Sequence, residues 1–279
     1  MTASAICVRG LSKSYGRLPA VRDLDLDVGY GEVFAILGPN GAGKSTTIEI
    51  LEGHRRRDAG QVSVLGEDPG TAGRSWRARI GIVLQESSDF GMLTVLETTR
   101  MFAKCYGEAR VPEELLELVG LTASSGSRVR TLSGGQRRRL DVALGIIAEP
   151  ELLFLDEPTT GFDPEARRQF WDLIRVLADD GTTILLTTHY LEEAAALADR
   201  VAVIAGGRVA AVDSPARLTA LVHSAATVRW MEGDEVHEEE TDHPTELIRQ
   251  RSADGAELAQ LTVTRPTLED AYLRLIGLA

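Results

Sequence analysis

Hydrophobic and polar residues alternate in the first part of the chain, between residues 6 and 27. The alternation is clear in the run ICVR at 6–9 and in the run VRDLDLDV at 21–28. A period of two predicts strands that are buried on one face and exposed on the other. Between them, the segment KSYG at 13–16 predicts a turn that carries the aromatic ring of Tyr15. Similar short runs predict further strands at 61–65 and 79–84.

Three other runs are short and almost continuously apolar: 33–37, 152–155 and 183–187. Such runs are typical of parallel strands that are covered on both faces. Asp163, followed by Pro164, predicts a capped helix start between the second run and the third. After the third run, two further apolar segments flank Gly206-Gly207 and predict a hairpin with a two-residue primed turn.

The middle and the end of the chain have a different texture. From about residue 86 to residue 147, apolar residues recur at helical spacing, which predicts a mostly helical subdomain. The clearest helical segments are 95–106 and 113–119. Beyond Pro215 we expect an acidic loop from Glu232 to Asp242, a strand at 262–264 and a closing helix at 268–278. The sequence therefore predicts a first domain of residues 1–217 and a small accessory C-terminal domain of residues 218–279.

The charge, the cysteines and the length of the apolar runs limit the partners and the cellular location that we expect. The formal net charge is −12, and residues 218–279 hold 5 Arg against 12 Asp and Glu. This balance disfavours nucleic acid, which binds basic surfaces. Cys7 and Cys105 form no C-x-x-C pair, so we expect two small buried side chains in a reducing compartment. Because there is no leader and no apolar run near ~20 residues, we expect a soluble chain that reaches a membrane only through a partner.

The strand predicted at 33–37 runs into a glycine-rich loop and then into a helical pattern. The loop reads GPNGAGKST, which fits the phosphate-binding pattern G-x-x-x-x-G-K-[ST] in its strand–loop–helix context. Glycines let backbone N–H groups point at an anion, and the helix start adds further donors. A flexible surface turn is the alternative, but it leaves that context unexplained. The predicted triphosphate-binding residues are Gly38, Pro39, Asn40, Gly41, Ala42, Gly43, Lys44, Ser45 and Thr46, with Lys44 on the β- and γ-phosphates and Ser45 on Mg²⁺.

Two carboxylates, Asp156 and Glu157, follow the apolar run at 152–155. In open α/β sheets, ligands bind at the carboxyl ends of the strands. Asp156 fits the acidic residue that holds the metal ion. Glu157 points elsewhere and can polarise an attacking water as a general base. A helix-capping turn is the alternative, but so apolar a strand rarely ends in two adjacent acids without a cation.

A second anion-binding helix start is predicted at Leu132-Ser133-Gly134-Gly135-Gln136, which precedes a helical pattern at 137–148. With the phosphate loop and Asp156-Glu157, this LSGGQ segment resembles the nucleotide-binding subunits of ATP-binding cassette (ABC) transporters. The resemblance covers residues 6–215. It implies a P-loop NTPase cassette of the α/β class, with a mostly parallel core sheet, an antiparallel β subdomain, a helical signature subdomain and a small C-terminal domain.

The resemblance also implies roles for residues that the sequence pattern alone does not identify as functional. Gln85 matches the Q-loop residue that contacts Mg²⁺ or its water and reports the nucleotide state to the partner. His189 matches the switch histidine that bonds the γ-phosphate, and Asp163 matches the D-loop. Tyr15 matches the aromatic that stacks on adenine, with a core tyrosine as the alternative. In the family, the signature residues Ser133, Gly134, Gly135 and Gln136 of one subunit close over the phosphate loop of another.

Three segments are similar to one branch of the family, drug-export ATPases of the daunorubicin-resistance type. They are RRRL at 137–140, TTG at 159–161 and RPTLEDAY at 265–272. The resemblance implies an ATP- and Mg²⁺-dependent ATPase, dimeric on ATP, at the cytoplasmic face of the cell membrane. It would power export of a drug-like or other hydrophobic compound by a separately encoded permease.

Three other functions are alternatives to export. An importer subunit shares every catalytic motif and is the nearest alternative. A soluble non-transport ABC ATPase usually has two cassettes or a long coiled coil, and this chain shows one cassette and no sustained heptads. A GTPase or kinase would leave LSGGQ unexplained, and the chain has no N-K-x-D guanine-reading motif.

Overall fold

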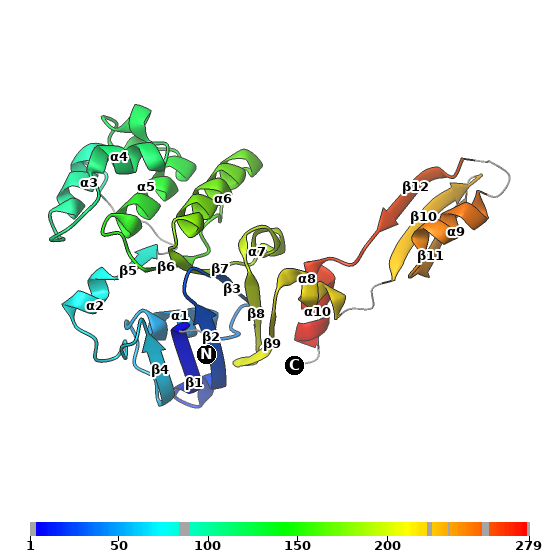
Figure 1. Cartoon of the computed structure of the whole chain (residues 1–279), viewed down its shortest axis with the longest axis horizontal. Helices are drawn as coiled ribbons and strands as arrows, with labels where there is room; N and C mark the ends of the chain where they lie inside the picture. Colours follow the sequence, from blue (N-terminus) through cyan, green and yellow to red (C-terminus); the bar gives the residue numbers. More distant parts are fainter. Residues whose placement is uncertain (1–3, 84–89, 222–224, 234, 253–256, 278–279) are drawn as a thin grey trace.

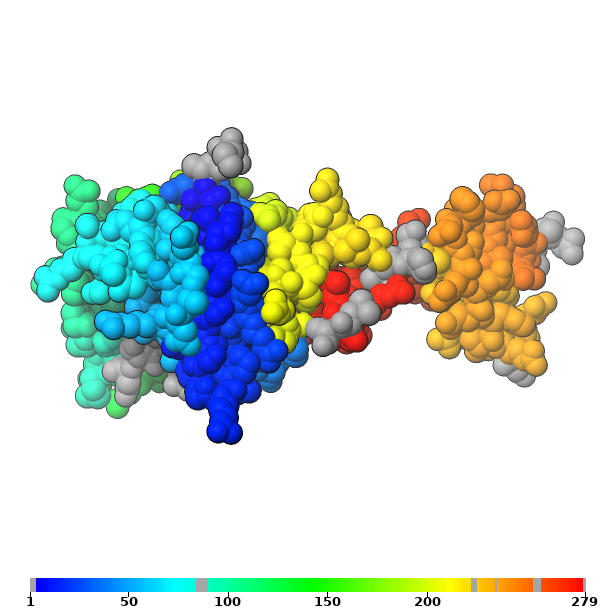
Figure 2. Space-filling view, turned by 90° about the horizontal axis from the view of Figure 1, so that it is seen from below, coloured from blue at the N-terminus to red at the C-terminus, as the bar shows by residue number. Residues whose placement is uncertain are grey.

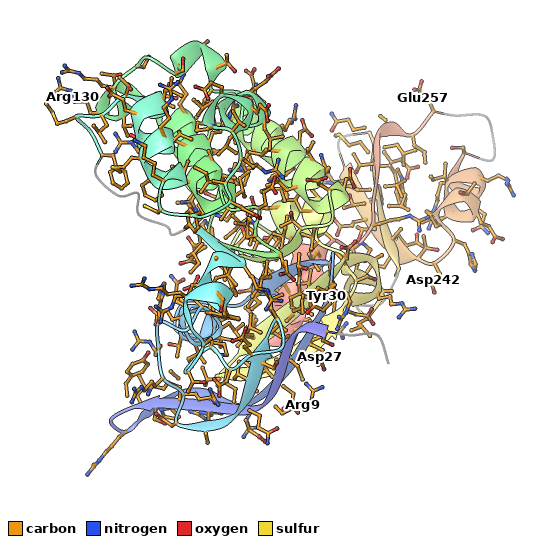
Figure 3. The ribbon with its side chains drawn as sticks, turned by 60° about the vertical axis from the view of Figure 1, so that its left-hand side comes forward. Arg9, Asp27, Tyr30, Arg130, Asp242 and Glu257 are labelled. Carbon is orange, nitrogen blue, oxygen red and sulfur yellow. The ribbon has the colours of Figure 1, made fainter. Side chains whose placement is uncertain are left out.

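The computed structural model describes residues 4–83, 90–221, 225–233, 235–252 and 257–277. A core of β-sheets and helices carries a helical part at one end, and a separate small sheet extends from the other (Figure 1). In a view from below, that small sheet is joined to the core by a narrow neck (Figure 2). Arg130 lies at the far tip of the helical part, whereas Asp242 and Glu257 lie on the small sheet's side (Figure 3).

The central sheet has the strand order β5-β6-β7-β3-β8-β9. Every neighbouring pair is parallel except β8 and β9, which form the predicted hairpin. Its turn residues Gly206 and Gly207 have φ values of 56° and 80°, as a primed turn requires. The mostly parallel sheet is confirmed. The strands are β3 (Val33–Leu37), β5 (Ile80–Val83), β6 (Leu152–Asp156), β7 (Thr183–Thr187), β8 (Arg200–Ala205) and β9 (Arg208–Asp213).

Both faces of the central sheet are covered, which explains why its strands are continuously apolar. Val33, Ala35 and Leu37 of β3 face a core shared with α5 (Gly134–Ile146), α6 (Pro164–Asp179) and α7 (Leu191–Leu197). Phe34 and Ile36 face a second core. Helix α1 (Lys44–Leu51) and an antiparallel sheet close that core. This sheet has the order β2-β1-β4, from β1 (Ser4–Tyr15), β2 (Leu18–Gly29) and β4 (Ala59–Val64).

The helical part is built as the periodicity predicted. Its elements are α3 (Val95–Ala103), α4 (Pro112–Leu118), the 3-10 turns η1 (Thr122–Ser124) and η2 (Val129–Thr131), and α5. A capping box between Thr94 and Glu97 starts α3, because each side chain bonds the other residue's backbone N–H. A short helix, α2 (Arg74–Ala78), precedes β5. Gln85 lies outside the described residues.

The C-terminal segment contains a second antiparallel sheet, with the order β11-β10-β12. The prediction of an acidic loop at 232–242 was wrong, because most of it is strand β11. Its half-buried residues have partners on neighbouring segments. His237 stacks on the ring of Trp230, and Glu239 forms an ion pair with Arg251 at 2.9 Å. Charges on both faces had hidden the period of two. The elements are α8 (Pro215–Ala220), β10 (Ala226–Glu232), β11 (Glu235–Thr241), α9 (Pro244–Arg251), β12 (Ala259–Thr264) and α10 (Leu268–Gly277).

Helix α10 does not stay with this small sheet. Leu268 is buried in the main core, and Tyr272, Leu275 and Ile276 pack against that core. The chain thus leaves the main core after α8, forms the small sheet, and returns to the main core (Figure 1).

The two cysteines were expected to be buried, and that expectation was wrong. Cys7 is partly buried on β1 and Cys105 is exposed just after α3. None of the helices in the described part of the chain combines the length and the apolar character needed to span a membrane.

Candidate functional site

The loop between β3 and α1 is held in a shape that requires glycine. Gly43 caps α1 with a φ of 103°, a left-handed conformation that L side chains rarely adopt. A Cβ atom on Gly43 would lie 2.4 Å from the carbonyl oxygen of Ala20, and one on Gly38 would lie 2.4 Å from that of Ile204. The loop is therefore wedged against β2 and β8, and neither glycine has room for a side chain.

Lys44 folds back into this loop. Its Nζ donates hydrogen bonds to the carbonyl oxygens of Gly38 at 2.7 Å and Pro39 at 3.2 Å. The residue is only 8% exposed. Burial lowers the pKa of Lys44, and the nearby carboxylates of Glu157 and Asp156 partly oppose that shift. A buried ammonium inside a glycine cradle fits the phosphates of a nucleotide.

The other predicted loop residues lie around this cradle. Ala42 is buried, and its carbonyl accepts a hydrogen bond from Gly207 at 3.2 Å, which ties the loop to the β8–β9 turn. The hydroxyl of Thr46 lies 3.4 Å from that of Tyr15. The exposed residues of the loop are Pro39, Asn40, Gly41 and Ser45.

The sheet brings the predicted carboxylates to the same level as this loop. Strand β7 lies between β6 and β3, and Thr187 is in register with both Asp156 and Ile36. Thr187 links the strand ends: its hydroxyl donates to Asp156 Oδ1 and accepts from the backbone N–H of Glu157 at 3.1 Å. Thr187 was not among the predicted site residues. Its place at the end of the apolar run at 183–187 could have indicated that it lies at the edge of the sheet.

Glu157 and His189, two of the predicted catalytic residues, lie side by side. His189 Nδ1 lies 3.3 Å from Glu157 Oε2. The Thr160 hydroxyl donates to the same oxygen at 3.3 Å. Both side chains are partly exposed, so they open onto solvent at the edge of the sheet. A carboxylate so placed can accept a proton from water.

Hard oxygen ligands for a divalent cation are present near the loop. Mg²⁺ is usually bound by one or two protein oxygens, completed by substrate phosphates and water. The hydroxyl of Ser45 and the carboxylate of Asp156 have the right chemistry, and the cradle beside them fits the phosphates. The third predicted ligand, Gln85, lies outside the described residues.

The predicted signature segment begins α5. Ser133 Oγ accepts from the backbone N–H of Gln136 at 3.3 Å, and the Gln136 side chain accepts from the backbone N–H of Ser133 at 3.0 Å. This capping box fixes the helix start. Gly134 is exposed, and a Cβ atom there would meet nothing within 4 Å. The segment therefore offers a free surface to a partner.

The structure places the signature next to the predicted D-loop. A Cβ atom on Gly135 would lie 3.5 Å from that of Ala166 on α6. Asp163 caps α6 as expected, since its Oδ1 accepts from the backbone N–H of Ala166 at 2.8 Å. By contrast, among the described residues no hydrogen bond joins the signature to the phosphate loop.

Tyr15 ends β1 beside the start of α1 and is 42% exposed. Arg55 lies over its ring, 5.1 Å from the centroid. The alternative of a core tyrosine is therefore wrong.

Two buried charged residues near the site were not predicted. Arg138 on α5 reaches the backbone after β6, and Glu52 follows α1 with 5% exposure. Helical spacing carried a signal for Arg138, because Val142 and Ile146, four and eight residues later, are also buried.

Comparison with known proteins agrees with this geometry. The family model described as ABC transporter matches residues 21–160. The daunorubicin resistance ATP-binding protein DrrA2 of Streptomyces coeruleorubidus is 38% identical over 310 residues, which cover 99% of this chain and 96% of that protein. The Nod factor export ATP-binding protein I of Rhizobium sp. (strain N33) is 36% identical over 302 residues, covering 99% and 98%.

Solved structures share the fold. An ATP-binding subunit of an ABC transporter has a TM-score of 0.73 and 24% identity, over 98% of this chain and 99% of its own. A dimeric bacterial ABC transporter cassette has a TM-score of 0.67 and 23% identity, over 75% and 98%. The chain belongs to the ABC transporter family and is one of its ATP-binding cassettes, which are ATPases.

Proposed function

We propose that this chain binds and hydrolyses ATP to power export of a drug-like or other hydrophobic compound by a separately encoded permease. The observation that carries the ATPase part is the pairing of Glu157 with His189 at 3.3 Å, beside the loop that holds Lys44. The export part is supported by the two relatives, which are named for daunorubicin resistance and for Nod factor export.

In this proposal each residue acts through position and charge. Lys44 exchanges its loop carbonyls for β- and γ-phosphate oxygens, and the loop N–H groups hold the rest of the triphosphate. Ser45 and Asp156 hold Mg²⁺, with Gln85 as a further ligand. The ion would neutralise phosphate charge. Glu157 accepts the proton of the attacking water, and His189 bonds the γ-phosphate. Tyr15 stacks on the adenine.

We further infer that two copies close head to tail on two ATP molecules. The start of α5 is exposed and capped, and helix starts attract anions. Because no hydrogen bond in the described part of the chain ties the signature to its own phosphate loop, a second copy can supply the signature. The dimeric cassette of similar fold supports this arrangement. Asp163, which caps the neighbouring helix α6, then lies at the same interface between the two copies.

The permease contact is proposed at a groove of about 440 Å³ between the helical part and the core. Apolar side chains such as Phe102 of α3 and Leu144 of α5 line it together with charged ones such as Glu52. A groove with this mixed lining can accept an amphipathic helix of a partner protein. The chain would then act as a peripheral subunit at the cytoplasmic face of the cell membrane. The cassette of residues 1–217 would carry the ATPase, with the C-terminal domain of 218–279 as an accessory that is anchored to the cassette by α10.

Reconstitution tests the proposal. The chain is co-purified with its membrane partner and placed in inverted vesicles with a fluorescent hydrophobic drug. Export predicts ATP-dependent accumulation inside the vesicles, which is lost in Glu157→Gln. ATP-dependent loss of preloaded compound would instead identify an importer. Purification of an active ATPase without any membrane protein, from gently solubilised cells, would favour the soluble alternative.

A further inference from the structure

The guanidinium of Arg138 is buried against the turn that follows β6. The residue is 7% exposed. Its Nε donates to the carbonyl oxygen of Pro158 at 2.9 Å, and one terminal nitrogen donates to the carbonyl oxygen of Asp156 at 2.8 Å. These two carbonyls lie on either side of Glu157. A planar guanidinium is suited to two directed bonds of this kind, which a lysine ammonium does not reproduce.

The turn that Arg138 holds is strained at Glu157. The φ of Glu157 is 43°, in the left-handed region that is unfavourable for a residue with a side chain. Its backbone N–H is held by Thr187 of β7. Arg138 therefore fixes the carbonyls of the same turn from the opposite element, α5. The side chain of Glu157 is directed at His189 by this doubly held backbone.

The charge of Arg138 is compensated within the site. Burial lowers the pKa of Arg138, whereas the carboxylates of Asp141, Asp156 and Glu193 raise it. Glu193 belongs to α7, four residues after His189, and accepts from the Trp171 indole at 3.1 Å. The guanidinium thus contacts the turn at Glu157, and carboxylates of the signature helix and of α7 favour its charge.

We propose that Arg138 is a positioning residue for Glu157, and that it ties the general base to the helix that begins with the signature. Arg138 lies five positions after Ser133 on the rigid helix α5. A displacement of α5 when a partner engages the signature would move the guanidinium and the two carbonyls together. The inference rests on the proposed role of Glu157 in ATP hydrolysis.

The test uses Arg138→Met, which keeps much of the volume and removes every donor, and Arg138→Lys, which keeps the charge. The kcat of Arg138→Met should fall about 10- to 100-fold, as expected for a misplaced general base, with the KM for ATP unchanged. Arg138→Lys should lie between this variant and wild type. Arg139→Met is the matched control, because its side chain bonds Gln169 on the surface of α6.

A double variant separates positioning from a general structural role. If Arg138 acts through Glu157, single-turnover hydrolysis by Glu157→Gln should not fall further when Arg138→Met is added. Losses that multiply in the double variant, or unchanged turnover in Arg138→Met, would overturn the inference. Should Arg138→Met fail to bind ATP or to melt cooperatively, the same cycle is run with Arg138→Lys. Full turnover in Glu157→Gln alone would instead refute the proposed function.

Discussion

His189 Nδ1 and Glu157 Oε2 are 3.3 Å apart, although 31 residues, including helix α6 and strand β7, separate them in the chain. The parallel register of β6 and β7 produces this pair, because both strands end at the same edge of the sheet. The carboxylate and the imidazole therefore form one unit, held over the opening beside the phosphate loop.

Replacing Glu157 by Gln should abolish ATP turnover and leave ATP binding intact. The amide keeps the size of the side chain but cannot take a proton from water. A loss of about 100-fold or more in phosphate release is expected. In the presence of ATP the variant should also accumulate as a dimer, because hydrolysis no longer reopens the closed state. Light scattering measures this accumulation. The exposed Glu117→Gln on α4 is the matched control and should behave as wild type.

Gly134→Asp should block turnover without harming the fold of its own subunit. A Cβ atom on Gly134 meets nothing within 4 Å, so the start of α5 has room for a side chain. In a head-to-tail dimer it would meet the phosphates bound to the other copy, and like charges repel. The expected result is normal thermal stability and normal ATP binding by the monomer, with loss of phosphate release.

Mixing two inactive variants tests whether the signature acts in trans. Glu157→Gln and Gly134→Asp, combined at equal concentration, form some mixed dimers. One site of each mixed dimer has a normal Glu157 from one subunit and a normal signature from the other. Turnover should therefore reappear on mixing. If every mixture stays inactive while mixed dimers are detected by pull-down with two tags, the shared site is wrong.

Local chemistry made much of the site predictable from the sequence. The phosphate loop, the acids after β6, the capped starts of α5 and α6 and the β8–β9 turn each depend on a few adjacent residues with strict conformational demands. Gly43 illustrates this, because its φ of 103° at the start of α1 is one that L side chains rarely adopt. Such conformational requirements can therefore be recognised from a short stretch of sequence.

Features set by tertiary contacts were not predictable in the same way. The helical spacing of Arg138 from Val142 and Ile146 signals that it is buried, but its carbonyl partners after β6 follow only from the packing of α5. Thr187 matters because β7 lies between β6 and β3, an order that follows from the whole sheet. Strand β11 was misread because its partners, Trp230 and Arg251, come from other segments. The return of α10 to the main core has the same origin.

Replacing Tyr15 by Ala should raise the KM for ATP roughly tenfold, as expected from the loss of one base–aromatic stack. Turnover at saturating ATP should stay normal, because Tyr15 lies beside Thr46 and away from the Glu157–His189 pair. Tyr15→Trp should keep the affinity. Tyr30→Ala is the control, since this exposed tyrosine follows β2 on another part of the sheet (Figure 3). An unchanged KM in Tyr15→Ala would exclude stacking on adenine.

Glu52 gives the stability of the protein a specific pH dependence. Burial raises the pKa of Glu52 to about 8, and the charges of Asp156 and Glu49 add to that shift. His54 Nδ1 lies 3.2 Å from its Oε2. Because the folded pKa lies above the ordinary value of 4.5, the folded state keeps a proton that the unfolded state releases. The free energy of unfolding should therefore decrease as pH rises from about 4.5 to about 8, by on the order of 1 kcal/mol per pH unit.

Urea unfolding of wild type and Glu52→Gln across pH 5 to 9 measures this contribution. Glutamine cannot ionise, so the variant lacks this loss, and the difference in unfolding free energy should grow in its favour up to about pH 8. Contributions from other groups, such as Lys44, are common to both proteins and cancel in that difference. Glu114→Gln on the exposed face of α4 should track wild type at every pH. If Glu52→Gln runs parallel to wild type throughout the range, Glu52 titrates normally and is hydrated in the folded protein.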